Sequence, residues 1–261
     1  MALRKCACID TLYTELPFLQ RLAAAKRDGF DGVDFWEWRP HDLAQLRAAA
    51  EDCGIRIHSF DGDADFSLVD PAHKARYLDF LGRSLEAARF LGAESLTIHS
   101  NALDRNGQVI DSYDGLSDTV KLCAMYDTLL DCARMAERSQ IRLNLEALNV
   151  TTDHPGNFLT TTQMSAEVCR LIGSPWLKIL YDVYHMQISE GSLCDHIAAY
   201  CDQIGHVHAA DVPGRHEPGT GEINYPRVLE QLERCGYTGC VGFELFPQTD
   251  TAAAVQAIMK L

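Results

Sequence analysis

The stretch RLNLEAL, residues 142–148, has the short, apolar and alternating character of a buried β-strand that ends on a glutamate. Three later stretches repeat this pattern: LKILYDV (177–183), IGHVHAAD (204–211) and CVGFELF (240–246). The polar residues near their carboxyl ends are Glu146, Asp182, His208 and Glu244. They are 36, 26 and 36 residues apart, a spacing that indicates successive strand–helix repeats.

The same alternation of strand-like and helix-like segments extends through the rest of the chain. Four more strands are predicted upstream, at KCACID (5–10), GVDFWEW (32–38), IRIHSFD (55–61) and SLTIHS (95–100). A helical segment follows each strand, and the second helix has clear boundaries, with Asp42 as its N-cap and Gly54 as its C-terminal stop. Eight such units predict parallel strands joined by helical crossovers.

We therefore predict an α/β fold, a single (β/α)8 TIM-barrel domain over residues 1–261. The main alternative is an open, doubly wound sheet. The chain has no GxGxxG motif at its first strand–helix turn, which disfavours the dinucleotide-binding form of that alternative. In a TIM barrel the catalytic groups lie at the carboxyl ends of the strands, where the four polar residues are expected.

Composition argues against several classes of function. The hydrophobic fraction of 47% and the charged fraction of 23% are typical of globular proteins. A formal net charge of −14 argues against a nucleic-acid partner. The first residues, MALRKCACIDTLY, lack the apolar core of a secretory signal, and no segment is long and apolar enough for a membrane span. We expect a cytoplasmic protein that binds neither membranes nor nucleic acid.

Ten cysteines are spread along the chain without a CxxC pair. In a cytoplasmic protein of this size we expect reduced thiols that act as small core hydrophobes. One close pair, Cys6 and Cys8, alternates along a predicted strand. The spacing also disfavours a structural zinc site.

Alternation along the strands places the polar residues of the four stretches inside the barrel. If Leu143 and Leu145 face the helices, Glu146 faces the barrel axis. The same parity points His208 and Glu244 inward. Burying charges there requires compensation, which a divalent cation supplies.

The kinds of side chain indicate which metal is expected. Three carboxylates and one imidazole, without a thiolate, fit Mn²⁺ best, with Mg²⁺ or Co²⁺ as alternatives. Such a centre suits a hydroxy ketone, because the metal stabilises the negative charge of its enediolate. Taken singly, a strand-end carboxylate can instead cap a helix or pair with an arginine, and a histidine can be an ordinary hydrogen-bonded barrel residue. The four together favour a metal site.

Longer motifs are more specific: NLEALN (144–149), YDVYHMQISEG (181–191), GHVHAADVPGRHEPGTGEINY (205–225) and GYTGCVGFELFP (236–247). They resemble the hydroxypyruvate isomerase-type members of the sugar phosphate isomerase/epimerase superfamily, which has the xylose isomerase-like TIM barrel. The similarity is densest between residues 142 and 247. Before residue 139 it is looser and depends on the strand–helix rhythm and on FDGDADFSLVDP (60–71).

The resemblance implies a set of metal ligands: Glu146, Asp182, His208 and Glu244. It further implies that Glu146 and Glu244 flank the substrate carbon and carry its proton. A histidine at position 208 is more similar to the ketose 3-epimerases. The resemblance therefore leaves both kinds of substrate open.

Five more residues are candidate substrate contacts: His185, Arg215, His99, His216 and Trp36. His185 resembles the substrate-hydroxyl binder of the family, although it could instead orient a metal ligand. Arg215, in the loop after the seventh strand, suits a terminal hydroxyl, carboxylate or phosphate. His216 shares that loop, His99 ends the fourth strand and Trp36 follows the second. Each of these last three is also compatible with ordinary packing.

These residues predict a metal-dependent isomerase or epimerase of a small ketose or keto-hydroxy acid, with proton transfer through a cis-enediolate. A lyase or dehydratase acting on an oxo-sugar or inosose would use the same site. A non-catalytic sugar-binding partner subunit is a further alternative, and an endonuclease IV-like enzyme is disfavoured by the negative charge. The expected partner is a small sugar or keto acid, and the family implies a possible homo-oligomer.

Overall fold

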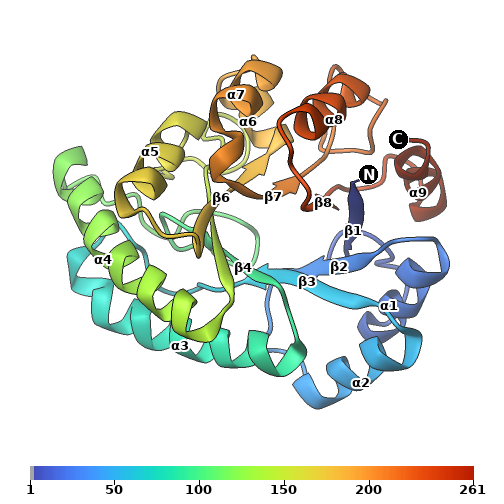
Figure 1. Cartoon of the computed structure of the whole chain (residues 1–261), viewed down its shortest axis with the longest axis horizontal. Helices are drawn as coiled ribbons and strands as arrows, with labels where there is room; N and C mark the ends of the chain where they lie inside the picture. The colour runs from blue at the N-terminus through green and yellow to red at the C-terminus, as the bar shows by residue number, and fades with distance from the viewer. Residues whose placement is uncertain (1–2) are drawn as a thin grey trace.

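The computed structural model describes residues 3–261 as a ring of parallel strands surrounded by helices (Figure 1). The strands are neighbours in chain order, and β8 pairs with β1 to close the barrel. The strands are β1 (Arg4–Cys8), β2 (Gly32–Phe35), β3 (Arg56–Asp61), β4 (Ser95–His99), β5 (Arg142–Glu146), β6 (Leu177–Asp182), β7 (Ile204–His208) and β8 (Cys240–Phe243). The predicted TIM barrel is confirmed.

Helices connect consecutive strands around the outside of the barrel (Figure 1). The α-helices are α1 (Phe18–Arg27), α2 (Leu43–Cys53), α3 (Lys74–Leu91), α4 (Asp118–Ser139), α5 (Thr162–Ile172), α6 (Val183–Ser189), α7 (Leu193–Tyr200), α8 (Tyr225–Arg234) and α9 (Thr251–Met259). Short 3-10 helices, η1 (Pro71–His73) and η2 (Cys201–Gln203), precede α3 and β7.

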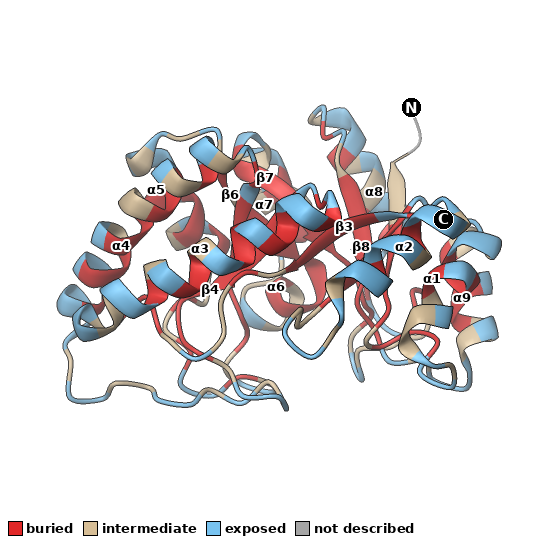
Figure 2. Ribbon diagram, turned by 90° about the horizontal axis from the view of Figure 1, so that it is seen from below, coloured by how far each residue is buried: buried red, intermediate tan, exposed pale blue. Residues whose placement is uncertain are grey.

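The hydrophobic core lies between the strands and the helices. Leu143 and Leu145 of β5 and Val207 of β7 are fully buried within it. Burying an aliphatic side chain of this size contributes about 1.5–3 kcal/mol to stability. Figure 2 shows the buried faces of the helices turned toward the strands and their exposed faces turned outward. The opposite faces of the strands therefore line the barrel axis.

Helix boundaries follow the capping chemistry expected from the sequence. Asp42 accepts hydrogen bonds from the backbone N–H groups of Ala44 and Gln45, which satisfies two donors at the start of α2. Gly54 follows α2 with a φ of 68°, a left-handed conformation that glycine adopts without a Cβ clash. Pro71 begins the turn that leads into α3.

Two local features differ from the sequence-based expectation. One helix is expected between β6 and β7, whereas the structure has both α6 and α7 there. α6 begins directly after β6 because Asp182 accepts hydrogen bonds from the N–H groups of Tyr184 and His185. Glu244 lies one residue beyond β8, which ends at Phe243.

The prediction that the cysteines are reduced packing residues is wrong for two of them. Cys6 of β1 and Cys240 of β8 form a disulfide, with their Cα atoms 6.4 Å apart. They are 234 residues apart in the chain. Only closure of the barrel brings the first and last strands together, so the sequence gives no local sign of the pair.

All eight strands contribute to the one closed barrel. The prediction of a single domain over residues 1–261 includes two residues outside the described range and stays a prediction. Within residues 3–261, no helix combines the length and apolar character needed to cross a membrane.

Candidate active site

The carboxyl ends of β5 to β8 bring the four predicted metal ligands to one end of the barrel. We call Glu146, Asp182, His208 and Glu244 the carboxyl-end cluster. All four are buried, with exposed fractions of 4%, 1%, 7% and 8%. One donor atom from each of the first three lies within 4.8 Å of the other two. Glu244 contacts this group of three through His208, because Oε2 of Glu244 lies 3.2 Å from Nδ1 of His208.

Asp182 uses its two oxygens for different purposes. Oδ1 accepts hydrogen bonds from the N–H groups of Tyr184, at 2.7 Å, and His185, at 3.1 Å. Oδ2 lies 3.4 Å from Nη2 of Arg215. Burial raises the pKa of Asp182 to about 7, although Arg215 opposes the shift. One oxygen thus caps α6, and the other remains available to the site.

Glu244 is held as a carboxylate by three neighbours. Trp36 donates its indole N–H to Oε1, and Arg215 donates from Nη2 to Oε2 at 2.6 Å. Burial disfavours the ionised form, but Arg215 and His208 outweigh it and hold the pKa of Glu244 well below its usual range. The structure therefore brings two predicted substrate contacts, Trp36 and Arg215, against a predicted catalytic glutamate.

Arg215 is a buried cation in the loop after β7. Its guanidinium lies 5.1 Å from the centre of the Tyr184 ring and bridges Glu244 and Asp182. Its backbone has a φ of 56°, in the left-handed region that a side chain rarely adopts. Its Nε is buried and has no hydrogen-bond partner, so this donor is available to a ligand.

His99 connects the carboxyl-end cluster to the loop after β3. Its Nε2 lies 3.2 Å from Oε2 of Glu146, and its Nδ1 lies 3.0 Å from Oδ1 of Asp63. Burial opposes a charge on the ring, but the carboxylates of Asp63 and Glu146 outweigh burial and raise the pKa of His99 well above its usual value. The protonated ring orients Glu146.

His185 and His216, two further predicted contacts, occupy different surroundings. His185 is 1% exposed, lies 2.7 Å from the side-chain nitrogen of Asn149 and has Nε2 at 3.7 Å from Oδ2 of Asp182. Burial lowers its pKa well below the usual value, so the ring is neutral. His216 instead lies with Nδ1 2.7 Å from the carbonyl of Phe246, on the exposed side of its loop.

The carboxyl-end cluster contains polar atoms that the protein itself leaves unsatisfied. Oε1 of Glu146 and Nε2 of His208 are buried without a hydrogen-bond partner, while Nδ1 of His208 lies 3.2 Å from Glu244. Each such atom costs about 1–3 kcal/mol in a protein interior. A divalent cation held by Glu146, Asp182 and His208 would satisfy them, and an oxygen-rich donor set suits Mn²⁺, Mg²⁺ or Co²⁺. The residues therefore fit a divalent cation.

Several residues outside the predicted set also support the site. Asp63 holds His99, and Asn149 contacts His185. Asp61 ends β3, and burial raises its pKa well above the usual value. Asp61 stands at the carboxyl end of a strand, which is the same signal that marks the four predicted ligands. Asp63 and Asn149 lie in loops, where no periodicity marks them.

Comparison with known proteins identifies the family of the chain. Residues 22–261 match the family model described as xylose isomerase-like TIM barrel. The chain belongs to this family. It is 32% identical to hydroxypyruvate isomerase of Escherichia coli, over 97% of this chain and 97% of that protein. It is 31% identical to 2-oxo-tetronate isomerase of Cupriavidus necator, over 97% of this chain and 96% of that protein.

Solved structures show the same fold. The AP endonuclease, family 2 from Brucella melitensis superposes with a TM-score of 0.89 at 24% identity, covering 100% of this chain and 99% of that chain. At this identity the likeness concerns the fold alone. The predicted resemblance to hydroxypyruvate isomerase-type proteins is confirmed by the full-length curated relatives.

Proposed function

We propose that this protein is a divalent-metal-dependent isomerase of a small 2-keto-3-hydroxy acid that works through a cis-enediolate. The observation that carries the proposal is the convergence of Glu146, Asp182 and His208 beside the ionised Glu244, with Oε1 of Glu146 and Nε2 of His208 buried without a hydrogen-bond partner. The curated relatives are a hydroxypyruvate isomerase and a 2-oxo-tetronate isomerase, which confirm the predicted enzyme class. The substrate, the metal and the residue roles are our proposal.

The cation would be held by Glu146, Asp182 and His208, with Glu244 beside them, and we propose Mn²⁺. When bound, it supplies electrostatic stabilisation for the negative charge that develops on the enediolate oxygens. Arg215 partly offsets the negative charge of this cluster in the absence of substrate, through its contacts with Asp182 and Glu244.

Glu146 and Glu244 are the proposed proton carriers. One carboxylate takes the proton from the carbon that bears the hydroxyl, and the C–H electron pair becomes the C=C bond of the enediolate. The carboxyl group that took this proton, or the other one after the proton has passed to it, returns it to the former carbonyl carbon, while one proton passes between the two oxygens, so both glutamates end in their starting state. His99 orients Glu146, and Trp36 orients Glu244 through the indole N–H. The product has the same composition as the substrate.

Arg215 is the proposed contact for the carboxylate of the substrate. Its planar guanidinium suits bidentate recognition, and its buried Nε–H has no partner in the protein. The neutral ring of His185 has Nε2 near Asp182 and suits a substrate hydroxyl. A buried arginine with an available donor favours a keto acid over a neutral ketose, so ketose 3-epimerisation is the second choice.

Proton NMR in D₂O tests the proposal. Mn²⁺-loaded protein is incubated with hydroxypyruvate, tartronate semialdehyde, 2-oxo-tetronate, tagatose and psicose in separate samples. We expect deuterium to enter one carbon of a keto acid, with a new isomer of equal carbon count and no reaction after chelation of the metal. Loss of water from a substrate would identify the lyase. Ligand binding without C–H exchange in metal-loaded protein would identify a sugar-binding subunit.

A further inference from the structure

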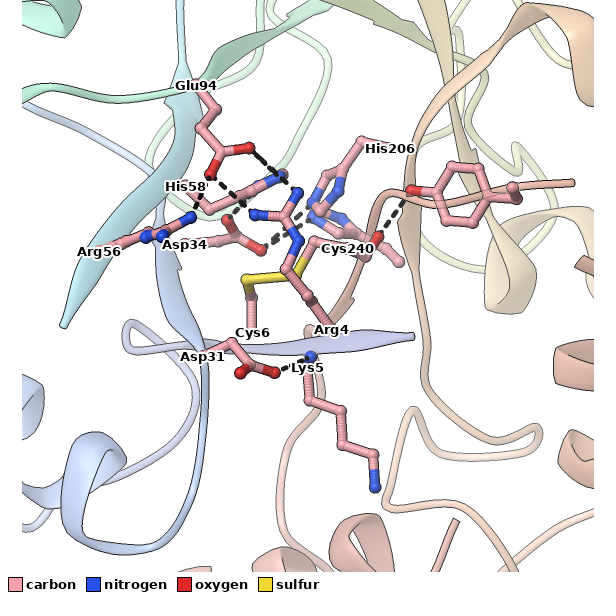
Figure 3. The surroundings of a disulfide bond; sticks show 12 residues. Arg4, Lys5, Cys6, Asp31, Asp34, Arg56, His58, Glu94, His206 and Cys240 are labelled. Atoms are coloured by element: carbon pink, nitrogen blue, oxygen red, sulfur yellow. Dashed lines mark hydrogen bonds and ion pairs between the residues drawn. A yellow bond between two sulfur atoms is a disulfide. The ribbon is translucent and has the colours of Figure 1, made fainter. Parts of the chain in front are cut away.

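The amino end of the barrel interior holds a second buried group of potential metal ligands, which the proposed reaction does not use. We call Cys6, Cys240, His58, His206 and Asp34 the amino-end cluster (Figure 3). They come from β1, β8, β3, β7 and β2, and none is more than 5% exposed. In most TIM barrels, large branched apolar side chains fill this space.

Two overlapping groups of three donors make up the amino-end cluster. The donor atoms of Cys6, His58 and Cys240 lie within 4.8 Å of one another, and so do those of Asp34, His58 and His206. Asp34 links the histidines, with Oδ1 3.3 Å from Nδ1 of His58 and Oδ2 3.2 Å from Nε2 of His206. The remaining ring nitrogen of His206, Nδ1, is buried without a partner.

Two glycines make room for these side chains on the barrel axis. A Cβ atom at Gly32 would lie 3.0 Å from the sulfur of Cys6, and one at Gly242 would lie 2.3 Å from Oδ2 of Asp34. A larger residue at either position would displace the cluster. The interior is therefore shaped around sulfur, imidazole and carboxylate groups.

The amino-end cluster lies close to solvent although it is buried. Arg4 and Glu94 form an ion pair of 2.9 Å, with side chains 36% and 38% exposed. Oε2 of Glu94 lies 3.8 Å from Nε2 of His58, so this pair covers the end of the barrel beside the histidine (Figure 3). Movement of two exposed side chains would give a cation access from this end.

We propose that reduction of the Cys6–Cys240 disulfide turns this cluster into a Zn²⁺ site. Cys6, Cys240 and His58 supply three ligands, and Asp34 or His206 supplies the fourth. Two thiolates with imidazole are a donor set that Zn²⁺ prefers, in contrast to the oxygen donors at the other end of the barrel. The carboxylate of Asp34 also provides the orienting contact that metal-bound histidines commonly have. Disulfide and metal exclude each other because both use the two sulfurs.

A phosphine can supply the two electrons that reduce the disulfide to two thiols. The disulfide takes two electrons and two protons and becomes two thiols, while the phosphine becomes a phosphine oxide with oxygen from water. Zn²⁺ then replaces both thiol protons without changing its own oxidation state. The sulfurs separate to about 3.8 Å, as two thiolates on a tetrahedral zinc with Zn–S bonds of about 2.3 Å require.

Cobalt titration of the full chain tests the site. Phosphine-reduced, chelator-stripped protein should bind Co²⁺ with a thiolate-to-cobalt charge-transfer absorption, which one equivalent of Zn²⁺ abolishes. Oxidised protein should lack this absorption, and the reduced C6S and C240S variants, which each keep one of the two sulfurs, should show half of it or less. The reduced Cys201→Ser variant, at a free, half-buried cysteine, and the Asp182→Asn variant, at the carboxyl-end cluster, should retain it. The reduced D34N and H206A variants show which residue supplies the fourth ligand.

X-ray absorption identifies the atoms bound to zinc in the reduced wild-type protein. This measurement does not depend on the folding of any variant. We expect sulfur atoms at about 2.3 Å from the zinc with nitrogen or oxygen completing four ligands. A zinc shell of nitrogen and oxygen alone would overturn the proposal. So would a charge-transfer absorption of wild-type intensity in both C6S and C240S, because other cysteines would then supply the thiolates.

Discussion

The two ends of the barrel axis carry buried donor groups of opposite chemical character. The carboxyl-end cluster offers three carboxylates and one imidazole, whereas the amino-end cluster offers two sulfurs, two imidazoles and one carboxylate. Hard oxygen donors suit Mn²⁺ or Mg²⁺ and leave room for substrate, while thiolate and imidazole suit a closed zinc site. The first cluster has a carboxylate oxygen, Oε1 of Glu146, that is buried without a partner, whereas the two sulfurs of the second are joined in a disulfide.

This difference matches the division of labour in TIM barrels, where the carboxyl end is catalytic and the amino end contributes to stability. Changes at Glu146 or Glu244 should therefore affect turnover and leave stability largely unaffected. Changes at Cys6 or Cys240 should do the reverse. Each of the following predictions tests that separation.

The largest expected effect is on turnover in the Glu244→Gln variant. Removing a positioned general base or acid costs about 10²- to 10⁴-fold in kcat, and glutamine keeps the size of the side chain. Steady-state kinetics with the keto acid found by NMR measure the loss. The control is Glu86→Gln, at an exposed position of α3, which should keep wild-type turnover. Wild-type kcat in metal-loaded Glu244→Gln would contradict the proposed role of this carboxylate.

The next effect is on stability, at the opposite end of the barrel. Reduction of the Cys6–Cys240 disulfide, which joins positions 234 residues apart, should lower the free energy of unfolding. Native disulfides contribute about 2–5 kcal/mol. Guanidinium unfolding followed by circular dichroism measures the change, and Zn²⁺ added to the reduced protein should restore part of it.

Two cysteine variants separate this effect from general reduction of thiols. Cys201→Ser should lose stability on reduction as the wild type does, because Cys201 is a free cysteine. Cys6→Ser should be insensitive to the reductant. An equal response of both variants would show that the disulfide is not the source of the stability change.

A third, smaller effect should distinguish acid from neutral substrates. Arg215→Lys keeps the charge but loses the planar fork, so KM should rise for a keto acid more than for a ketose. A hydrogen bond to a charged group contributes about 1.5–3 kcal/mol, which corresponds to a rise in KM of about 10- to 100-fold. Arg170→Lys, at an exposed ion pair with Asp202, is the matched control. Equal rises in KM for both substrate types would argue against carboxylate recognition by Arg215.

The sequence predicted the carboxyl-end cluster well because its information is local. In β5, alternation of Leu143 and Leu145 with Glu146 shows which face each side chain takes, and the strand end shows where along the barrel it lies. The fold follows from eight repeats of that pattern. Trp36 and Arg215, selected for their positions just after strands, both contact Glu244, and their roles toward substrate stay predictions.

The amino-end cluster could not be predicted in the same way. Cys6 and Cys240 come into contact only because the first and last strands pair. The sequence around each cysteine contains no sign of this contact. The register shift in β2–β3 pairing between Val33 and Asp34 is equally invisible in the sequence. His216 follows Arg215 in the chain, but its Nδ1 lies 2.7 Å from the carbonyl oxygen of Phe246, and its contact with substrate stays a prediction.

The last prediction concerns the effect of pH on the binding of Mn²⁺ to the carboxyl-end cluster. Burial disfavours a charged His208, but Glu244 outweighs burial and raises the pKa of His208 to about 10, whereas burial raises that of Asp182 to about 7. Below pH 7 both groups carry a proton in metal-free protein, and above it only His208 does. Since the cation replaces these protons, affinity should rise with pH, by about tenfold per pH unit for each proton released.

Calorimetry in buffers of different ionisation enthalpy counts the released protons directly. We expect the number to fall from about two toward one as the pH rises through the pKa of Asp182, near 7. The His208→Asn variant should release one proton fewer at every pH in this range. The measurement uses chelator-stripped, oxidised protein, so that only the carboxyl-end cluster binds metal. A Mn²⁺ affinity that does not change between pH 6 and 8 would mean that His208 and Asp182 are not ligands. Of the two proposed metal sites, only the sulfur-containing site at the amino end would then remain.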